Sequence, residues 1–483
     1  MRILFASSEV VPFAKAGGLA DVSHHLPKAL AKLGHEVHVV TPMYKEAREC
    51  GKIITDTGRT LLVPISFRTE EARLYRSDIS ESVVVHLIRK DDLYDREGLY
   101  GNEYGDYEDN AERFIFFSRA VLDLCKELGL QPDVIHCNDW QTGLTPLYMK
   151  SLYREVPQIA KAGSLFTIHN LGSQGIFWSL DMHLTGLGWE YFNMEALEFY
   201  GNMNLTKAGI VFADRISTVS HAYAEEILTP EFGFGLDGVL LTRKNHLSAI
   251  MNGVDYNRWD PTLDRHIASN FGIDHLEPKQ LCKKDLLSAF QMDSDLSCPV
   301  VAMISRLVGR KGFDLLAGVF DDLIAMGLRF VIMGKGEDRY HSFLKEMAGR
   351  HPGKVGLSIS YDYCMAHRIE AGADFFLNPS LYEPCGLDHL YGMRYGTIPV
   401  VRATGGLGET VKEYHPETGQ GTGFRFYDYS PQALMDSLRK AVNYYDNKDH
   451  WMQLVRNAMR EEFSWETSAK AYLDLYESVA RKV

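Results

Sequence analysis

Long hydrophobic runs are missing from this sequence. No stretch approaches the roughly 18 consecutive apolar residues that a membrane-spanning helix needs. The apolar start of the chain, Met1 to Pro12, is short and is interrupted by Glu9. We therefore interpret it as a first buried strand and not as a secretory signal, and we expect no membrane partner.

Paired cysteines and excess positive charge are missing as well. The seven cysteines are dispersed, odd in number and never spaced C-x-x-C, which argues against a disulfide framework or a cysteine-based zinc site. We expect reduced thiols in a cytoplasmic protein. The formal net charge of −13 argues against a general nucleic-acid or anionic-membrane partner. Any anionic substrate must be held by local cations.

The sequence lacks the motifs of several enzyme classes, or contains them without the required position or spacing. Asp293-Ser-Asp295 matches the Asp-x-Asp of metal-dependent glycosyl transfer in letters only, because it precedes a predicted strand. His136, Asp139 and His169 lack the close spacing of a metal site, so we expect no metal. A G-x-S-x-G elbow does not stand out either, which leaves acyl transfer poorly supported.

What is present is enough chain for more than one core. With 483 residues, 45% apolar and 24% charged, the sequence is typical of a globular enzyme of two domains. We place an N-terminal domain at 1–257, a C-terminal domain at 258–463 and a last helix, 464–483, that crosses back to the first domain. The polar run from Trp259 to Lys279 is interpreted as the crossing between them.

Both halves show short apolar strands that alternate with helices and end in polar or glycine-rich loops, which predicts doubly wound α/β domains. The first half has predicted strands at 2–7, 36–41, 83–88, 133–137, 165–168, 215–219 and 247–251, with helices at 19–33 and 111–128. The second has strands at 300–304, 328–333, 355–359, 375–377 and 398–401, with helices at 313–326, 364–371 and 431–446, and a helical tail from Glu461.

Cations recur beside glycines where strands end. Lys15 precedes Gly17 and Gly18, and Arg306 and Lys311 follow a predicted strand. Arginine and lysine can neutralise a diphosphate without a metal. Each cation alone is more often a solvated surface charge, but the spacing of Arg306 and Lys311, with Gly312 after it, favours a phosphate clamp.

The stretch from Asn378 to Leu407 carries the strongest pattern. A strand leads to Glu383, then to Gly386 and a helix, and a second strand leads to a second Gly-Gly turn. Helix amino ends attract phosphate, and a carboxylate accepts from hydroxyls, so this βαβ unit is suited to a sugar phosphate.

Polar residues also follow strands in the first half, among them Asp139, His169 and Asn170. His169 could instead be a core histidine. A retaining glycosidase would need two carboxylates about 5 Å apart, and the sequence leaves the separation of Asp139 and Glu383 open. The acidic and aromatic loop from 91 to 110 could line a sugar cleft or be solvated.

The turns Ala16-Gly-Gly-Leu and Thr404-Gly-Gly-Leu are alike, which suggests two similar nucleotide-fold halves facing one another across a cleft.

Together these motifs resemble the bacterial glycogen synthase and plant starch synthase family. The resemblance runs through nearly the whole chain in order and is most specific at Glu383-Pro-Cys-Gly-Leu387. It implies two Rossmann-like domains in the GT-B arrangement. It also implies metal-free transfer of glucose, with retention, from ADP-glucose to the non-reducing end of an α-1,4-glucan such as a maltooligosaccharide.

The resemblance also implies roles for individual residues. Lys15, Gly18, Arg306 and Lys311 would hold the diphosphate, and Tyr361 would lie near the adenine. Asp139, His169, Asn252, Glu383, Cys385 and Gly386 would surround the glucose. The catalytic set is expected to be Glu383, His169, Arg306 and Lys311. The expected substrate-binding set is Lys15, Gly17, Gly18, Asp139, Asn170, Asn252, Tyr361, Cys385, Gly386, Leu387, Tyr391 and Thr404.

Several positions depart from the family pattern. Asp388-His389 replaces the usual Thr or Ser followed by Gln, and Gln141, Ser173 and Leu381 replace a common His, Tyr and Arg. Two other hypotheses therefore stay open. One is a catalytically weak glucan-binding homologue, and the other is a transferase that uses UDP-glucose or a different acceptor.

Overall fold

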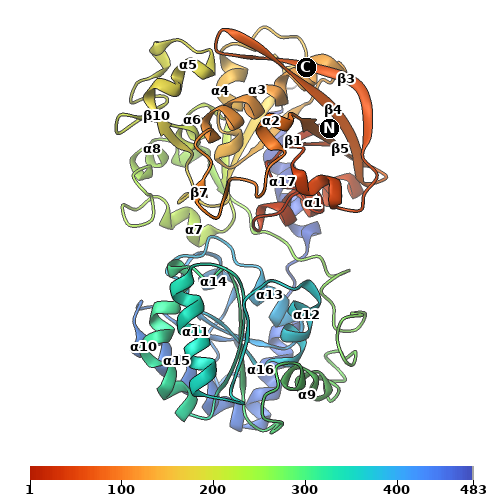
Figure 1. The fold of residues 1–483 in the computed structure, drawn as a ribbon. Coiled ribbons are helices and arrows are strands. Elements are labelled where there is room, and N and C mark those ends of the chain that lie inside the picture. The colour runs from red at the N-terminus through yellow and green to blue at the C-terminus, as the bar shows by residue number, and fades with distance from the viewer. Residues whose placement is uncertain (481–483) are drawn as a thin grey trace. The chain divides into compact units, whose positions relative to one another are not determined.

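The computed structural model describes residues 1–480 and divides the chain into two compact units (Figure 1). Unit 1 contains Met1–Gly253 and the segment from Trp465 onward, and unit 2 contains Val254–Ser464. Each unit is described by itself.

Unit 1 is built on a sheet with the strand order β14-β13-β9-β8-β1-β2-β5-β4-β3. Neighbours are parallel from β14 to β5, and β4 and β3 continue the sheet as an antiparallel hairpin. The bounds are β1 Arg2–Ala6, β2 Glu36–Pro42, β3 Thr55–Ile65, β4 Arg68–Ser80, β5 Val83–Arg89, β8 Val134–Asn138, β9 Gly163–Ile168, β13 Arg215–Thr218 and β14 Leu247–Ala249.

Helices and small hairpins surround this sheet. The helices are α1 Leu19–Lys32, α2 Asp91–Tyr94, α3 Asn110–Leu128, α4 Thr145–Lys150, α5 Met182–Thr185, α6 Leu205–Phe212, α7 His221–Glu226, α8 Asp237–Thr242 and α17 Trp465–Val479. The short strands are β6 Gly101–Asn102, β7 Gly105–Asp106, β10 Ile176–Trp178, β11 Glu198–Phe199 and β12 Asn202–Asn204.

The C-terminal helix α17 completes the core of unit 1, where it packs against α1 (Figure 1). Its Trp465, Tyr472 and Tyr476 are buried, as the apolar spacing of the tail predicts. The predicted start of this helix at Glu461 is wrong. Residues 461–464 are extended because the Phe463 carbonyl accepts from the N–H of Val254.

Unit 2 is built on a parallel sheet with the order β17-β16-β15-β18-β19-β20. Its strands are β15 Val300–Ile304, β16 Arg329–Met333, β17 Val355–Ser358, β18 Phe375–Asn378, β19 Ile398–Arg402 and β20 Phe424–Phe426. Its helices are α9 Lys279–Ala289, α10 Phe313–Ala325, α11 Asp338–Arg350, α12 Tyr363–Gly372, α13 Asp388–Arg394, α14 Gly405–Thr410, α15 Pro431–Asp446 and α16 Lys448–Arg460. This strand order is that of a Rossmann fold.

The stretch from Trp259 to Lys279, expected to cross between domains, is packed as part of unit 2. Val254, Trp259 and Phe271 are buried in its core. The Trp259 ring stacks on His367 of α12 at 3.8 Å between ring centroids. The stretch is mostly polar, but its few large apolar side chains, Trp259 and Phe271, are buried and hold it against the core of unit 2.

One buried carboxyl group of unit 2 lacks a hydrogen-bond partner among the described residues. Glu370 of α12 is fully buried, and neither of its carboxylate oxygens is hydrogen-bonded among residues 1–480. Burial raises the pKa of Glu370 well above its usual value, Asp388 raises the pKa further, and Lys279 opposes both. The folded protein therefore favours the protonated form of this carboxyl group.

The Glu370→Gln variant should be more stable than the parent protein at pH 8. Unfolding lets Glu370 ionise at its ordinary pKa of 4.5, so its raised folded pKa makes stability fall as the pH rises above that value. Each unit of pKa difference corresponds to about 1.4 kcal/mol. Thermal unfolding between pH 5 and 8 should show the advantage of the variant growing with pH. Parallel curves for the two proteins would contradict this.

Candidate active site

The predicted site residues gather where each sheet reverses its strand order. In unit 1 this switch lies between β1 and β8, and in unit 2 it lies between β15 and β18. Open α/β sheets bind ligands outside the carboxyl ends of strands at such a point. The loops that leave these strands carry Lys15, Asp139, Arg306, Lys311 and Glu383.

The Lys15 loop joins β1 to α1 and leaves room for a ligand. A Cβ added at Gly17 or Gly18 would have no neighbouring atom within 4 Å, and neither glycine has a positive φ. Neither the backbone conformation nor the packing therefore requires glycine here, whereas close approach of a ligand to the backbone would. The Lys15 Nζ lies 2.8 Å from the Asp21 carboxylate and is solvent-accessible.

Replacing Gly17 with alanine should leave stability unchanged and weaken donor binding. The added methyl group meets open space in the protein but occupies the surface that a diphosphate would approach. We expect the KM for the sugar-nucleotide donor to rise about tenfold, in line with roughly 1–3 kcal/mol for overpacking a close contact. Initial rates and the unfolding temperature should be measured together. A lowered unfolding temperature with an unchanged KM would show a structural role instead.

Asp139, after β8, has a strained backbone. Its φ of 55° and ψ of −177° are close to a region that is almost restricted to glycine, and such strain concentrates at functional sites. Its Oδ1 accepts from the N–H of His169 at 2.7 Å. Burial raises the pKa of Asp139 to about 7 and the charge of Glu9 adds to this, while the N–H groups of His169 and Asn170 oppose it.

His169 is oriented by its neighbour Asn138. Its Nε2 lies 2.9 Å from Asn138 Oδ1, and the Asn138 amide nitrogen donates to Ala6 O at 3.0 Å. Asn138 can therefore only accept from the ring, which places the histidine proton on Nε2 and leaves Nδ1 as an acceptor. Burial lowers the pKa of His169 to about 3, so the ring is neutral. His136, in contrast, lies in the core between Tyr476 and Thr167.

Two asparagines of unit 1 differ in whether their side-chain oxygen already accepts a hydrogen bond. The Asn170 side chain accepts from the N–H of Gly172 at 3.0 Å and shapes its own turn. Asn252, after β14, is buried, and its Oδ1 has no hydrogen-bond partner within residues 1–480. Such an oxygen can accept a hydroxyl of a bound ligand.

In unit 2, Glu383 and Lys311 form a buried ion pair. Ser380 Oγ also donates to the Glu383 carboxylate at 3.3 Å. Burial raises the pKa of Glu383, but Lys311 and Arg310 together lower it more, so the carboxylate is ionised. The two side chains meet because the loops after β15 and β18 are adjacent at the switch point.

The second glycine turn, at Gly405 and Gly406, is closely packed. A Cβ at Gly405 would lie 2.1 Å from the carbonyl oxygen of Glu383, and one at Gly406 would lie 2.1 Å from that of Cys385. The N–H of Gly406 donates to the Glu383 carbonyl at 3.1 Å. This turn therefore holds the Glu383 loop in place. The two Gly-Gly-Leu turns are alike in sequence but differ in role: the turn at Gly17 and Gly18 is open, and the turn at Gly405 and Gly406 is closely packed.

The remaining predicted residues lie around the same loops. Cys385 and Thr404 are buried, Gly386 has a φ of 72°, and Leu387 precedes α13. Arg306 is exposed at the end of β15, and Tyr361 is 55% exposed after β17. Tyr391 of α13 stacks on Trp259 with 4.2 Å between ring centroids, so one face of its ring is covered by protein.

Sequence reasoning missed Glu9 and Arg310. Glu9 is buried beside the Lys15 loop, and Arg310 lies over the ring of Tyr382 at 5.3 Å and lowers the pKa of Glu383. The signal for Glu9 in the sequence is a single charged residue, soon after the predicted strand at 2–7, in an otherwise apolar segment.

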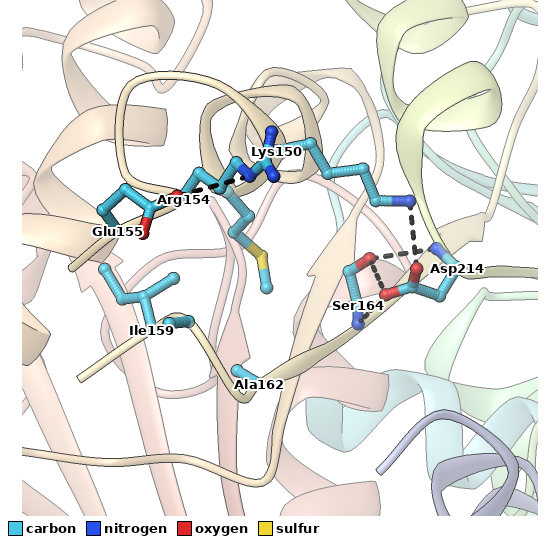
Figure 2. Close-up of a pocket in the computed structure, with 9 residues that line it drawn as sticks. Lys150, Arg154, Glu155, Ile159, Ala162, Ser164 and Asp214 are labelled. Carbon is cyan, nitrogen blue, oxygen red and sulfur yellow. Dashed lines mark hydrogen bonds and ion pairs between the residues drawn. The ribbon is translucent and has the colours of Figure 1, made fainter. Parts of the chain in front are cut away.

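A hollow of about 450 Å³ lies elsewhere in unit 1 (Figure 2). It is lined in part by Ser164 and Asp214, at the amino ends of β9 and β13, and by Lys150, the last residue of α4. The Asp214 carboxylate accepts from Ser164 N and Oγ at 2.8 Å, and Lys150 Nζ lies 2.9 Å from its other oxygen. These groups satisfy one another at the edge opposite to the switch point, so the hollow is not part of the candidate site.

Within residues 1–480, no cluster of three or more His, Cys, Asp or Glu side chains could hold a metal ion. No helix in the same range has both the length and the apolarity to cross a bilayer.

Two Rossmann-type sheets, with cations, a carboxylate and glycine turns at their switch points, define a glycosyltransferase that uses a nucleotide sugar. Comparisons with known proteins agree. Residues 2–242 match the starch synthase catalytic domain family, and residues 289–458 match the group 1 glycosyl transferases. The chain belongs to the glycogen synthase and starch synthase family.

Individual relatives cover the full chain. It is 44% identical to the glycogen synthase of Koribacter versatilis, over 99% of this chain and 98% of that one. It is 43% identical to that of Thermotoga maritima, with 100% of both covered. The catalytic domain of starch synthase IV from Arabidopsis thaliana, bound to ADP and acarbose, superposes with a TM-score of 0.91 at 30% identity, covering 99% of each chain. The predicted fold class is confirmed.

Proposed function

We propose that this hexosyltransferase elongates an α-1,4-glucan in glycogen biosynthesis by adding glucose from ADP-glucose with retention of configuration and without a metal. The observation that carries the proposal is the Glu383–Lys311 pair at the switch point of unit 2, in a chain of this family. The ADP bound to the starch synthase IV domain supports an adenine nucleotide as the donor. The seven free cysteines fit a reducing, cytoplasmic compartment.

The residues support a transfer through charge stabilisation. The bond between the glucose C1 and the diphosphate oxygen breaks, and its electron pair leaves with ADP. Cations stabilise that charge, as preorganised groups do at a developing anion, and each unit supplies one for this role, Lys15 in unit 1 and Arg306 in unit 2. The acceptor hydroxyl oxygen then forms the new bond to C1 on the same face, and its proton passes to the departing phosphate.

The glucose is held by neutral and ionised acceptors. In unit 1, His169 has an unprotonated Nδ1 that can accept from a sugar hydroxyl. In unit 2, the Glu383 carboxylate is kept ionised by Lys311 and can likewise accept from a hydroxyl. Asn252 Oδ1 offers a further acceptor. These contacts orient the ring and favour charge build-up at C1.

A comparison of donors tests the proposal. With a maltooligosaccharide acceptor, we expect ADP-glucose to support chain lengthening at least about tenfold faster than UDP-glucose, which amounts to roughly 1.4 kcal/mol of discrimination. Nucleotide release and product length should be measured for both donors. Equal rates would overturn the choice of donor. Glucan binding without turnover of either donor would favour a catalytically weak homologue.

Proton NMR of the product and addition of EDTA test the rest of the mechanism. A retaining transfer gives a new α linkage, and a metal-free reaction keeps its rate in the chelator. A β linkage would contradict retention. Loss of activity that Mg²⁺ restores would contradict the absence of a metal.

A further inference from the structure

The Lys15 loop is organised around an internal anion. Glu9 is 5% exposed, and its Oε2 accepts from the backbone N–H groups of Ala16 and Gly17, each at 2.8 Å. Successive N–H groups that point to one spot at a glycine-rich turn form a site for an anion. The protein fills this site with its own carboxylate.

The carboxylate of Glu9 is itself held in place. The Tyr100 hydroxyl lies 2.8 Å from Glu9 Oε1 and 2.8 Å from Ser8 Oγ. Burial raises the pKa of Tyr100 well above its usual value, so this group stays a neutral donor. Ser7 Oγ donates to the Glu9 carbonyl at 2.8 Å and accepts from Ser23 Oγ of α1. Hydrogen bonds therefore fix both the side-chain carboxylate and the backbone carbonyl of Glu9.

We propose that Glu9 is a positioning residue for the donor diphosphate. By occupying the N–H groups of Ala16 and Gly17, its carboxylate holds the loop in one shape before the ligand arrives. The diphosphate is then met by the Lys15 side chain and by the open surface of Gly17 and Gly18, and not by those two N–H groups. Because the loop is ordered when the protein folds, donor binding does not have to supply the free energy of ordering it.

This role rests on the proposed function, because it assumes that the Lys15 loop contacts the donor. It follows from contacts in which both carboxylate oxygens already accept from protein donors, Oε2 from the N–H groups of Ala16 and Gly17 and Oε1 from the Tyr100 hydroxyl. Glu9 is therefore distinct from the residues predicted to touch the substrate. Its loss should act on donor binding and leave the glucan acceptor unaffected.

The experiment compares three variants of the full chain. Glu9→Ala removes the anion, and Glu9→Gln keeps an acceptor oxygen but loses the charge. Glu49→Gln is the control, since it removes an exposed carboxylate from the segment that follows β2 and changes no contact of the loop. For each protein, the kcat, the KM for ADP-glucose, the KM for maltohexaose and the unfolding temperature are measured. Hydrogen exchange at the amides of Ala16 and Gly17 is followed in the absence of ligand.

We expect the donor KM to rise up to about 100-fold in Glu9→Ala, the scale at which misplacement by about 1 Å acts. Glu9→Gln should lie between that variant and the parent protein, and the acceptor KM should not change in any of them. Hydrogen exchange at the two amides should be faster in Glu9→Gln than in the parent protein, and faster still in Glu9→Ala. The control should match the parent protein in every measurement.

A donor KM that is unchanged in Glu9→Ala, or a loss of activity that follows only the unfolding temperature, would overturn the positioning role. Failure of the parent protein to use any sugar nucleotide would overturn the proposed function instead. In that case unchanged amide exchange in Glu9→Ala would refute the loop-holding role separately.

Discussion

Glu383→Gln should reduce turnover about 100-fold or more while the protein stays folded. Losing one preorganised polar contact at a reacting centre costs on this scale. Glutamine keeps the shape of the side chain and one acceptor oxygen, but it removes the charge that Lys311 neutralises. Steady-state release of ADP with saturating ADP-glucose and maltohexaose measures the loss.

The control for this experiment is Glu417→Gln, an exposed carboxylate of the same unit. It should keep the activity of the parent protein. Alanine is a poorer test at position 383, because it removes the charge and also the last side-chain oxygen that could accept from the largely buried Lys311. Breaking a buried pair in this way typically destabilises a protein by about 3–5 kcal/mol. Near-normal turnover of Glu383→Gln would remove this residue from the catalytic set.

Gly406→Ala should destabilise unit 2 by about 3 kcal/mol, the upper range for overpacking a close contact. The new Cβ would lie 2.1 Å from the Cys385 carbonyl oxygen and 2.6 Å from the Cys385 Cα, so backbone would have to move. The unfolding temperature should fall by roughly 6–12 °C for a unit of this size. Calorimetry on the full chain measures this.

Gly349→Ala provides the matched control, since a Cβ there meets no atom within 4 Å and Gly349 lies in α11. Alanine forms helices better than glycine, so this variant should gain up to about 1 kcal/mol. An unchanged unfolding temperature in Gly406→Ala would show that the turn can relax, and it would contradict a packing role for that glycine.

Much of the scaffold could be predicted because its signals are local. The strand at 375–377, the helix at 313–326 and the helix at 431–446 were recovered within one residue, since apolar spacing and flanking glycines report element type directly. The long hairpin of β3 and β4 was not anticipated. Its outer positions are polar and its pairing depends on an edge of the sheet, which no short-range pattern reveals.

For the candidate site, too, the sequence predicts some features and the strand order decides others. A lysine, an arginine or a carboxylate placed after a predicted strand indicates the carboxyl edge of a parallel sheet, and the structure does place Lys15, Asp139, Lys311 and Glu383 there. Which of these groups touch one another depends on strand order. The pairing of Lys311 with Glu383 arises because β15 lies next to β18, although 72 residues separate the two side chains.

By itself, the sequence determined the class of fold, the family and the edge of each sheet where chemistry is concentrated, because periodicity and motifs are properties of neighbouring residues. Only the tertiary structure decided the partners. It paired Glu383 with Lys311, distinguished the open turn at Gly17 from the packed turn at Gly406, and gave Glu9 a role. Contacts between distant segments follow from sheet order and close packing, and these are not written in any single stretch of the chain.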